Sequence, residues 1–242
     1  MPQYLTVKFK VEPMMQIVTD RFQLSKSLPL MEKQVMTWAE YDQWRDDRDA
    51  VGDKQLQWFF DQNCLWVRNM GWEGFVHTQI KDLFIMLLLT FWLSHDPQQK
   101  TYSMSGGLLE KTGLQAAAPD IVLYLGDEHP VWTEGETRRI DLDRWSVPNL
   151  VGEIADTTLA SDLHEMKQIY AAMGILEYWV VDVRGRRVLM FHLEGKHYVQ
   201  VAVSGVLPGL TVEVLGEAID RCLSDGHGAA VAWFMKGNRA SL

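Results

Sequence analysis

Two carboxylates stand within or beside apolar runs in the middle of this 242-residue chain. Asp120 follows a proline and begins the apolar run 121–123, and Glu153 lies inside the apolar run 150–155. Both runs are predicted to be strands, and the second is apolar enough to be buried on both faces of a sheet. A buried carboxylate is unfavourable unless a cation or hydrogen-bond donors compensate its charge. The fold must therefore bring a partner to Glu153.

The simplest interpretation of each residue alone is a solvent-facing carboxylate, at a strand start for Asp120 or on an edge strand for Glu153. Together the two carboxylates have a chemical rationale. At a separation of a few Å they repel each other unless a cation neutralises them. Mg²⁺ typically takes one or two carboxylates, waters and phosphate oxygens, and it activates water for attack on phosphate. The pair, with Lys167 nearby, predicts a metal-dependent site that cleaves phosphodiesters.

The elements around this pair predict an α/β fold with a mixed central sheet flanked by helices. The strand, helix and strand between residues 150 and 183 form a crossover unit, so the two strands should lie parallel. Helices over 74–94 and 159–173 are expected to flank the sheet, and Gly174 should end the second helix. Hairpins over 57–67 and 188–203 add strands that make the sheet mixed.

The chain shows no internal repeat and no linker long enough to divide it. Residues 1–35 are expected to form a peripheral N-terminal segment, and residues 36–242 a single domain. The stretch Thr37-Trp38-Ala39-Glu40 has the pattern of a capping box, which predicts that a short helix begins there.

Composition indicates the compartment. Cys64 and Cys222 lie far apart in no metal-like spacing, which favours a reducing environment. The first residues lack the pattern of a signal peptide. The most apolar stretch, 83–93, is shorter than the roughly 20 residues that a bilayer requires, so it predicts a buried core helix. We therefore expect a cytoplasmic protein that does not associate with membranes.

The net charge of −9 limits how the chain can bind nucleic acid. Proteins that bind nucleic acid indiscriminately are usually basic, so DNA binding here must be local or assisted by a divalent metal. A basic cluster of Arg184, Arg186, Arg187 and Lys196 lies on a predicted hairpin. A solvated turn is its simpler interpretation, and a phosphate-contacting patch is the alternative.

The segment 150–183 reads LVGEIADTTLASDLHEMKQIYAAMGILEYWVVDV. It resembles the Putative restriction endonuclease family, a bacterial branch of the PD-(D/E)XK nuclease superfamily. In that family a Glu-Ile-Ala/Ser-Asp strand end leads to an Asp-Leu helix, then to Tyr, Gly and Glu-Tyr-Trp. The resemblance extends from about Trp38 to Trp233. It implies a restriction-endonuclease-like fold, DNA cleavage with Mg²⁺ (or Mn²⁺ as a substitute), and Asp120 and Glu153 as the metal-binding carboxylates.

Two positions depart from the family pattern. The family places a lysine four residues after the helix aspartate, where this chain has Met166, and a strand glutamate where it has Trp58. Lys167 follows Met166. At 100° per residue it lies at the edge of the apolar stripe of its helix, from which its long side chain could reach Glu153. A solvated boundary lysine is the simpler interpretation.

These observations predict a Mg²⁺-dependent DNA endonuclease in which Asp120, Glu153 and Lys167 are catalytic. The backbone carbonyl of Ile154 is expected as a third metal ligand. The alternative is a catalytically degenerate protein that keeps the nuclease fold and serves as a binding or regulatory module. His77, early in the long apolar helix, is more simply a core or boundary histidine than a site residue.

The expected partners are DNA and a second copy of the chain. A duplex has two strands to cut, and most soluble oligomers are closed dimers. The sequence therefore predicts a homodimer, without indicating its interface.

Overall fold

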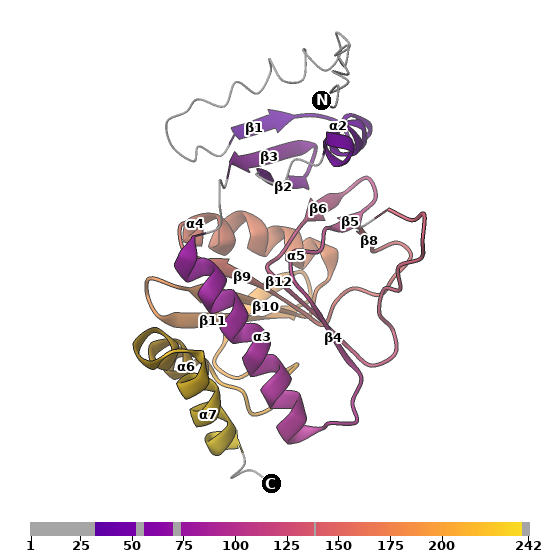
Figure 1. The fold of residues 1–242 in the computed structure, drawn as a ribbon. Coiled ribbons are helices and arrows are strands. Elements are labelled where there is room, and N and C mark those ends of the chain that lie inside the picture. Colours follow the sequence, from indigo (N-terminus) through magenta and orange to yellow (C-terminus); the bar gives the residue numbers. More distant parts are fainter. Residues whose placement is uncertain (1–31, 52–55, 70–73, 138, 239–242) are drawn as a thin grey trace, which may run out of the picture.

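The computed structural model describes residues 32–51, 56–69, 74–137 and 139–238 (Figure 1). Its main sheet has six strands in the order β12-β11-β10-β9-β7-β4. At its centre β9 (Leu150–Ala155) lies parallel to β10 (Glu177–Asp182), as the crossover unit predicts, and antiparallel to β7 (Ile121–Leu125). The predicted mixed α/β class is therefore confirmed. The outer strands are β4 (Thr101–Met104), β11 (Arg187–Glu194) and β12 (His197–Val201).

A second, smaller sheet stands at one end of the molecule, at the top of Figure 1, with the strand order β1-β3-β2-β6-β5-β8. The predicted hairpin supplies β2 (Leu56–Asp61) and β3 (Cys64–Asn69). The sequence pattern predicted one central sheet and gave no sign of this second one. The reason is that its other partners are too short to show an alternating pattern. These are β1 (Glu32–Val35), β5 (Leu109–Lys111), β6 (Gln115–Ala117) and β8 (Ile140–Asp141).

The capping box is present where the sequence predicts it. The Thr37 amide donates to Glu40 Oε2 at 2.7 Å, and the Glu40 amide donates to Thr37 Oγ1 at 3.3 Å. The helix after this box is α2 (Trp38–Val51). Of the predicted segment 1–35, residues 1–31 lie outside the described residues, and 32–35 form β1, which pairs with β3. The division at residue 35 stays a prediction.

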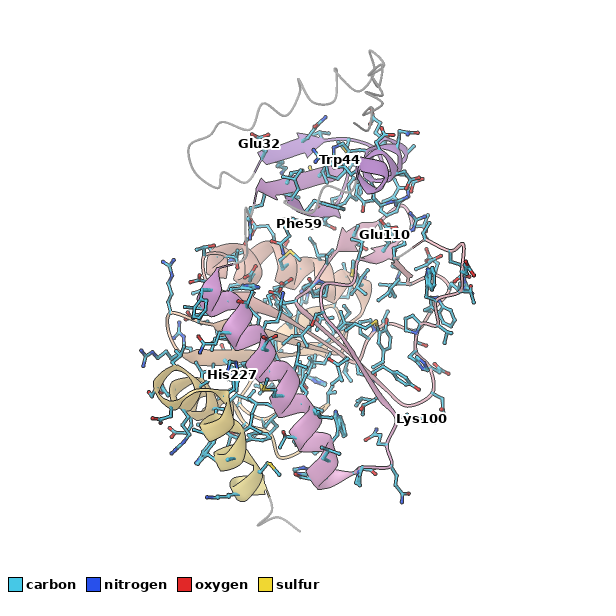
Figure 2. The ribbon with its side chains drawn as sticks, viewed as in Figure 1. Glu32, Trp44, Phe59, Lys100, Glu110 and His227 are labelled. Carbon is cyan, nitrogen blue, oxygen red and sulfur yellow. The ribbon has the colours of Figure 1, made fainter. Side chains whose placement is uncertain are left out.

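One face of the main sheet is covered by α3 (Phe75–His95), which packs on it together with α6 (Val212–Asp225) and α7 (His227–Asn238). Side chains of α3 such as Ile80 and Phe84 share a core with Ile154 and Trp179 of the sheet. Figure 2 labels His227, whose Nε2 lies 2.9 Å from the Gln79 carbonyl of α3.

The helix α3 is longer than the apolar stretch from which it was predicted. It has 21 residues, and by length and composition alone it could cross a membrane. Half of its apolar window is buried inside the protein, and buried core helices meet the same test. Nine of its side chains are buried, Leu83 and Phe84 completely, so much of the helix belongs to the core.

The opposite face of the sheet is covered by one continuous helical segment. It comprises α4 (Leu159–Ser161), a π-helical turn (Asp162–Met166) and α5 (Lys167–Met173). Gly174 ends it with φ 83°, as predicted. Phe59 of β2 joins this core, and Figure 2 shows it on the side of the small sheet that faces the main body. The strand β9 therefore lies between two helical layers.

Candidate functional site

The register of β7 on β9 brings Asp120 and Glu153 together. Ile121 lies opposite Gly152, and because the strands are antiparallel, one step further along the ladder sets Asp120 opposite Glu153. Asp120 Oδ2 accepts a hydrogen bond from the Ile154 amide at 2.9 Å. Successive side chains of a strand point to opposite faces, so Ile154 packs beneath α3 while Glu153 points toward α5.

Glu153 is a buried carboxylate with little compensation. Its side chain accepts a hydrogen bond from the Tyr170 hydroxyl at 2.5 Å. Burial raises the pKa of Glu153 well above its usual value, and the nearby charges of Asp120 and Asp162 raise it further. The Tyr170 hydrogen bond opposes this rise in pKa only in part. A cation bound beside Glu153 would relieve both effects.

Asp162 is a second buried carboxylate at this place, beside the partly buried Asp120, and the sequence pattern gave it no role in the site. It begins the π-helical turn and accepts a hydrogen bond from the Thr158 hydroxyl. Burial raises its pKa to about 6, whereas that hydrogen bond and the charge of Arg68 lower it. π-helical turns occur frequently at functional sites, but a uniform helical periodicity gives no signal for one.

Two basic residues of α3 face Asp120 from the other layer. His77 Nε2 lies 3.3 Å and Lys81 Nζ 3.6 Å from Asp120 Oδ1. They stand four residues apart, so both lie on one side of the helix. The sequence pattern gave Lys81 no role and favoured a core position for His77. The available signal was the pairing of two basic residues one turn apart at the start of a helix that is otherwise apolar.

Lys167 has a different neighbour. Its Nζ lies 3.8 Å from the centroid of the Phe191 ring on β11, and burial lowers its pKa. In the sheet, β10 and β9 stand between β11 and β7. The ammonium of Lys167 therefore lies two strands away from β9, toward the sheet edge opposite Asp120. Lys167 is half-buried next to the buried Met166, at the edge of the apolar stripe of its helix. The catalytic role of Lys167 stays a prediction.

A pocket of about 10 Å³ lies beside the buried carboxylates. This volume is close to the minimum of about 10–15 Å³ that one water molecule occupies. The two residues that depart from the family pattern, Trp58 and Met166, both line it. The apolar side chains therefore stand where the pattern has a glutamate and a lysine. The full lining is Gln57, Trp58, Phe59, Arg68, Ala118, Glu153, Asp162 and Met166.

The donors at this end of the sheet suit Mg²⁺. Asp120 and Glu153 supply hard carboxylate oxygens, and Mg²⁺ usually needs only one or two of these with several waters. The Ile154 carbonyl accepts from the Asp156 amide at 3.2 Å and has a second lone pair for a metal. Within the part of the chain that the structure describes, no group of three or more His, Cys, Asp or Glu is arranged to hold a metal ion. Any ion here would depend on water and substrate oxygens.

The arginines of the basic cluster after β10 form ion pairs at the surface, with side chains 57–72% exposed. Each arginine pairs with an acidic side chain: Arg184 with Asp156 at 3.3 Å, Arg186 with Asp220 at 3.3 Å, and Arg187 with Asp182 at 2.9 Å. Exposed ion pairs are weak, so the solvated turn and the phosphate-contacting patch both stay open as interpretations.

Comparison with known proteins adds two findings. The model of the Uma2 family, described as Putative restriction endonuclease, matches residues 38–220. A crystal structure described as a putative nuclease belonging to DUF820, from Anabaena variabilis ATCC 29413, is similar with a TM-score of 0.51 and 13% identity. The match covers 76% of this chain and 99% of that one, and at this identity it shows the fold. The predicted fold is thereby confirmed. No curated protein matches the chain.

Proposed function

Because the chain belongs to the Uma2 family of restriction-endonuclease-like proteins, we propose that it is a Mg²⁺-dependent DNA endonuclease that hydrolyses phosphodiester bonds. The observation that carries the proposal is the placement of Asp120 opposite Glu153 where β7 meets β9. Glu153 is buried and has its pKa raised by the neighbouring carboxylates, an arrangement that a divalent cation would stabilise.

In this proposal Asp120 and Glu153 hold Mg²⁺, with the Ile154 carbonyl as a third oxygen. An ion held there would supply Lewis-acid chemistry: it would polarise the phosphate and lower the pKa of a water molecule. The Ile154 amide orients Asp120, and the Tyr170 hydroxyl orients Glu153. In the reaction, the water oxygen bonds to phosphorus and one phosphorus–oxygen ester bond breaks. The departing oxygen takes up a proton, which leaves one phosphate monoester end and one hydroxyl end.

A second candidate function is a binding or regulatory module that keeps the nuclease fold without cleavage. The specific observation that favours it is the lining of the carboxylate pocket by Trp58 and Met166. These apolar side chains leave little room and no charge where the family pattern has a glutamate and a lysine. Such a protein would bind DNA without cutting it.

DNA is the proposed substrate, and a homodimer the proposed assembly, because a duplex has two strands to cut and closed dimers are common. We further propose a cytoplasmic location, in keeping with two free cysteines. Light scattering at micromolar concentration tests the dimer, and a monomeric mass would contradict it.

The metal site is tested by calorimetry with Mn²⁺ on the wild type and on Asp120→Ala. An exposed acidic residue near the end of α6, Asp225, gives the matched control Asp225→Ala. We expect binding by the wild type and the control, and loss of binding by Asp120→Ala. Equal binding by all three would contradict the site assignment.

Cleavage is tested with supercoiled plasmid DNA, Mg²⁺ and a chelator. The endonuclease proposal expects nicking that requires Mg²⁺ and is lost in Asp120→Ala. If the wild type binds Mn²⁺ and DNA but leaves the plasmid intact, the binding-module proposal is the one supported.

A further inference from the structure

A positive charge beside the carboxylates would stabilise a bound phosphate, and the position where the family pattern has a lysine is the buried Met166 in this chain. Met166 lies on the α5 side of the sheet, 5% exposed, in the core with Tyr170. Lys167, the residue after it, holds its ammonium over the Phe191 ring. The layer formed by α4, the π-helical turn and α5 therefore does not bring a lysine ammonium to Asp120.

The helix α3, on the opposite face of the sheet, does bring a lysine ammonium to Asp120. Lys81 of α3 holds its Nζ 3.6 Å from Asp120 Oδ1. The two oxygens of Asp120 are used differently, because Oδ2 accepts from the Ile154 amide of β9 whereas Oδ1 faces α3. Asp120 thus links the central strand to the helix, and Lys81 lies at the junction.

The position of Lys81 is fixed by the packing of its helix. The neighbouring side chains Ile80, Leu83 and Phe84 are completely buried against the sheet, which sets the height of α3 relative to β9. The side chains of Lys81 and Asp120 are 15% and 13% exposed. The pair is therefore anchored in the fold while part of it stays open to solvent, from which a phosphate can approach.

Arg68 is another basic residue close to the carboxylates, and its contacts are with the α4 side of the site. Its guanidinium donates to Ser161 Oγ at 2.7 Å, and its charge acts on Asp162. It lines the small pocket beside Met166, on the side of the sheet covered by α5. Lys81 instead faces Asp120 Oδ1 directly.

We propose that Lys81 is the phosphate-contacting residue of this site, and that α3 thereby supplies the charge that the family pattern places at position 166. This inference rests on the proposed function. In the free protein the ammonium neutralises Asp120. When DNA binds, it contacts a non-bridging oxygen of the phosphate, where negative charge grows during cleavage. A flexible four-carbon stem lets the ammonium make this change.

DNA binding gives a test that does not depend on cleavage. The affinity of a short duplex is measured by fluorescence anisotropy in Ca²⁺ over a range of salt concentrations, for the wild type, Lys81→Met and the matched control Lys100→Met, at an exposed lysine outside the site. We expect Lys81→Met to bind about tenfold more weakly, as loss of one charge-assisted contact does. Its salt dependence should fall by about one unit in slope. Equal affinity and slope in Lys81→Met and the wild type would overturn the inference.

Cleavage gives the second test. If the wild type cuts DNA with Mg²⁺, Lys81→Met should lower kcat by about 10²- to 10³-fold, as removal of one transition-state donor does, and Lys81→Arg should retain more activity. Cleavage that survives Lys81→Met unchanged overturns the role of Lys81 and leaves the proposed function intact. No cleavage by the wild type, with the binding defect of Lys81→Met still present, overturns the enzyme and keeps Lys81 as a phosphate contact.

Thermal unfolding of each Lys81 variant shows whether a loss of binding comes from unfolding of the protein instead of from the missing charge. Lys81→Arg keeps the charge and most of the stem, so its DNA affinity in Ca²⁺ should stay within a few-fold of the wild type. If Lys81→Met is poorly folded, Lys81→Gln replaces it in both assays. A charge-independent loss, equal in Lys81→Arg and Lys81→Gln, would overturn the inference.

Discussion

Two glutamates on neighbouring central strands, Glu153 of β9 and Glu177 of β10, are both buried, but they differ in how many hydrogen-bond donors compensate their charge. Glu177 is completely buried and accepts hydrogen bonds from Trp179 Nε1 at 2.7 Å and Ser204 Oγ at 2.5 Å. The amides of the two residues after Ser204 donate to its other oxygen at 2.8 and 3.1 Å. Glu153 receives the Tyr170 hydroxyl and the repulsion of two other carboxylates.

The difference shows which carboxylate is structural. Four hydrogen-bond donors compensate the charge of Glu177 and connect residues 204–206 to the start of β10. Glu177 therefore needs no further ligand, and its role is structural. Glu153 is left under-compensated in the free protein, and its raised pKa is the consequence. A buried carboxylate in that state is typical of a site that binds a cation.

The largest expected effect comes from removing the well-compensated carboxylate. Glu177→Ala leaves several buried donors without an acceptor, and we expect it to lower the free energy of unfolding by about 3–5 kcal/mol. Urea unfolding at pH 7 measures this. Glu194→Ala, at an exposed end of β11, is the matched control and should change stability by less than about 0.5 kcal/mol. If Glu177→Ala lowers the free energy of unfolding no more than Glu194→Ala does, Glu177 is not the structural carboxylate.

The next effect concerns pH and Asp162, whose pKa is raised to about 6 by burial. Between pH 4 and 6 the unfolded carboxyl ionises while the folded one keeps its proton, so the unfolded state binds fewer protons and stability falls as pH rises. The contribution of Asp162 to this fall should be roughly 3 kcal/mol and complete above pH 6. Urea unfolding from pH 4 to 8 should show a smaller fall for Asp162→Asn than for the wild type. Identical profiles would contradict the raised pKa.

A smaller effect of the opposite sign is expected from Glu153→Gln. The amide keeps the size of the side chain but removes the buried charge, so at pH 8 we expect the variant to be more stable by about 1–2 kcal/mol. The gain should vanish below about pH 3, where the wild-type carboxyl is protonated in both states.

With Mn²⁺ present, the wild type should become more stable than Glu153→Gln. The ion stabilises the wild type by binding the folded state and leaves Glu153→Gln unaffected. Thermal unfolding with Mn²⁺ and with chelator measures the reversal. A variant that Mn²⁺ stabilises as much as the wild type would show that Glu153 is not a ligand.

The sequence predicted the scaffold of this site well because the strands that carry it are continuous and apolar. The run 150–155 is β9 residue for residue, and the parallel pairing with β10 is a consequence of the crossover. The carboxylate pair is in turn a consequence of strand register. The cations could not be placed in the same way, since Lys81 belongs to a helix 39 positions before Asp120 and meets it only through tertiary packing.

The second sheet and the π-helical turn were missed for local reasons. Strands of two or three residues, such as β8 and β5, are too short to show a period. The π-helical turn begins at Asp162, and a uniform helical periodicity gives no signal for such a turn. Sequence periodicity therefore located the helix and its apolar stripe, but not the aromatic ring that Lys167 contacts.

That lysine gives the smallest expected effect and the sharpest check on which layer supplies the cation. Lys167→Met removes a cation–π contact with Phe191, which is worth about 0.5–1 kcal/mol at a partly exposed site. If α3 supplies the phosphate-contacting charge, this variant should unfold within about 1 kcal/mol of the wild type and cleave DNA at the same rate. A loss of cleavage of a hundredfold or more, with stability retained, would return the role to Lys167. The ammonium would then have to leave Phe191 when substrate binds, and Lys81 would be left as a neutralising partner of Asp120.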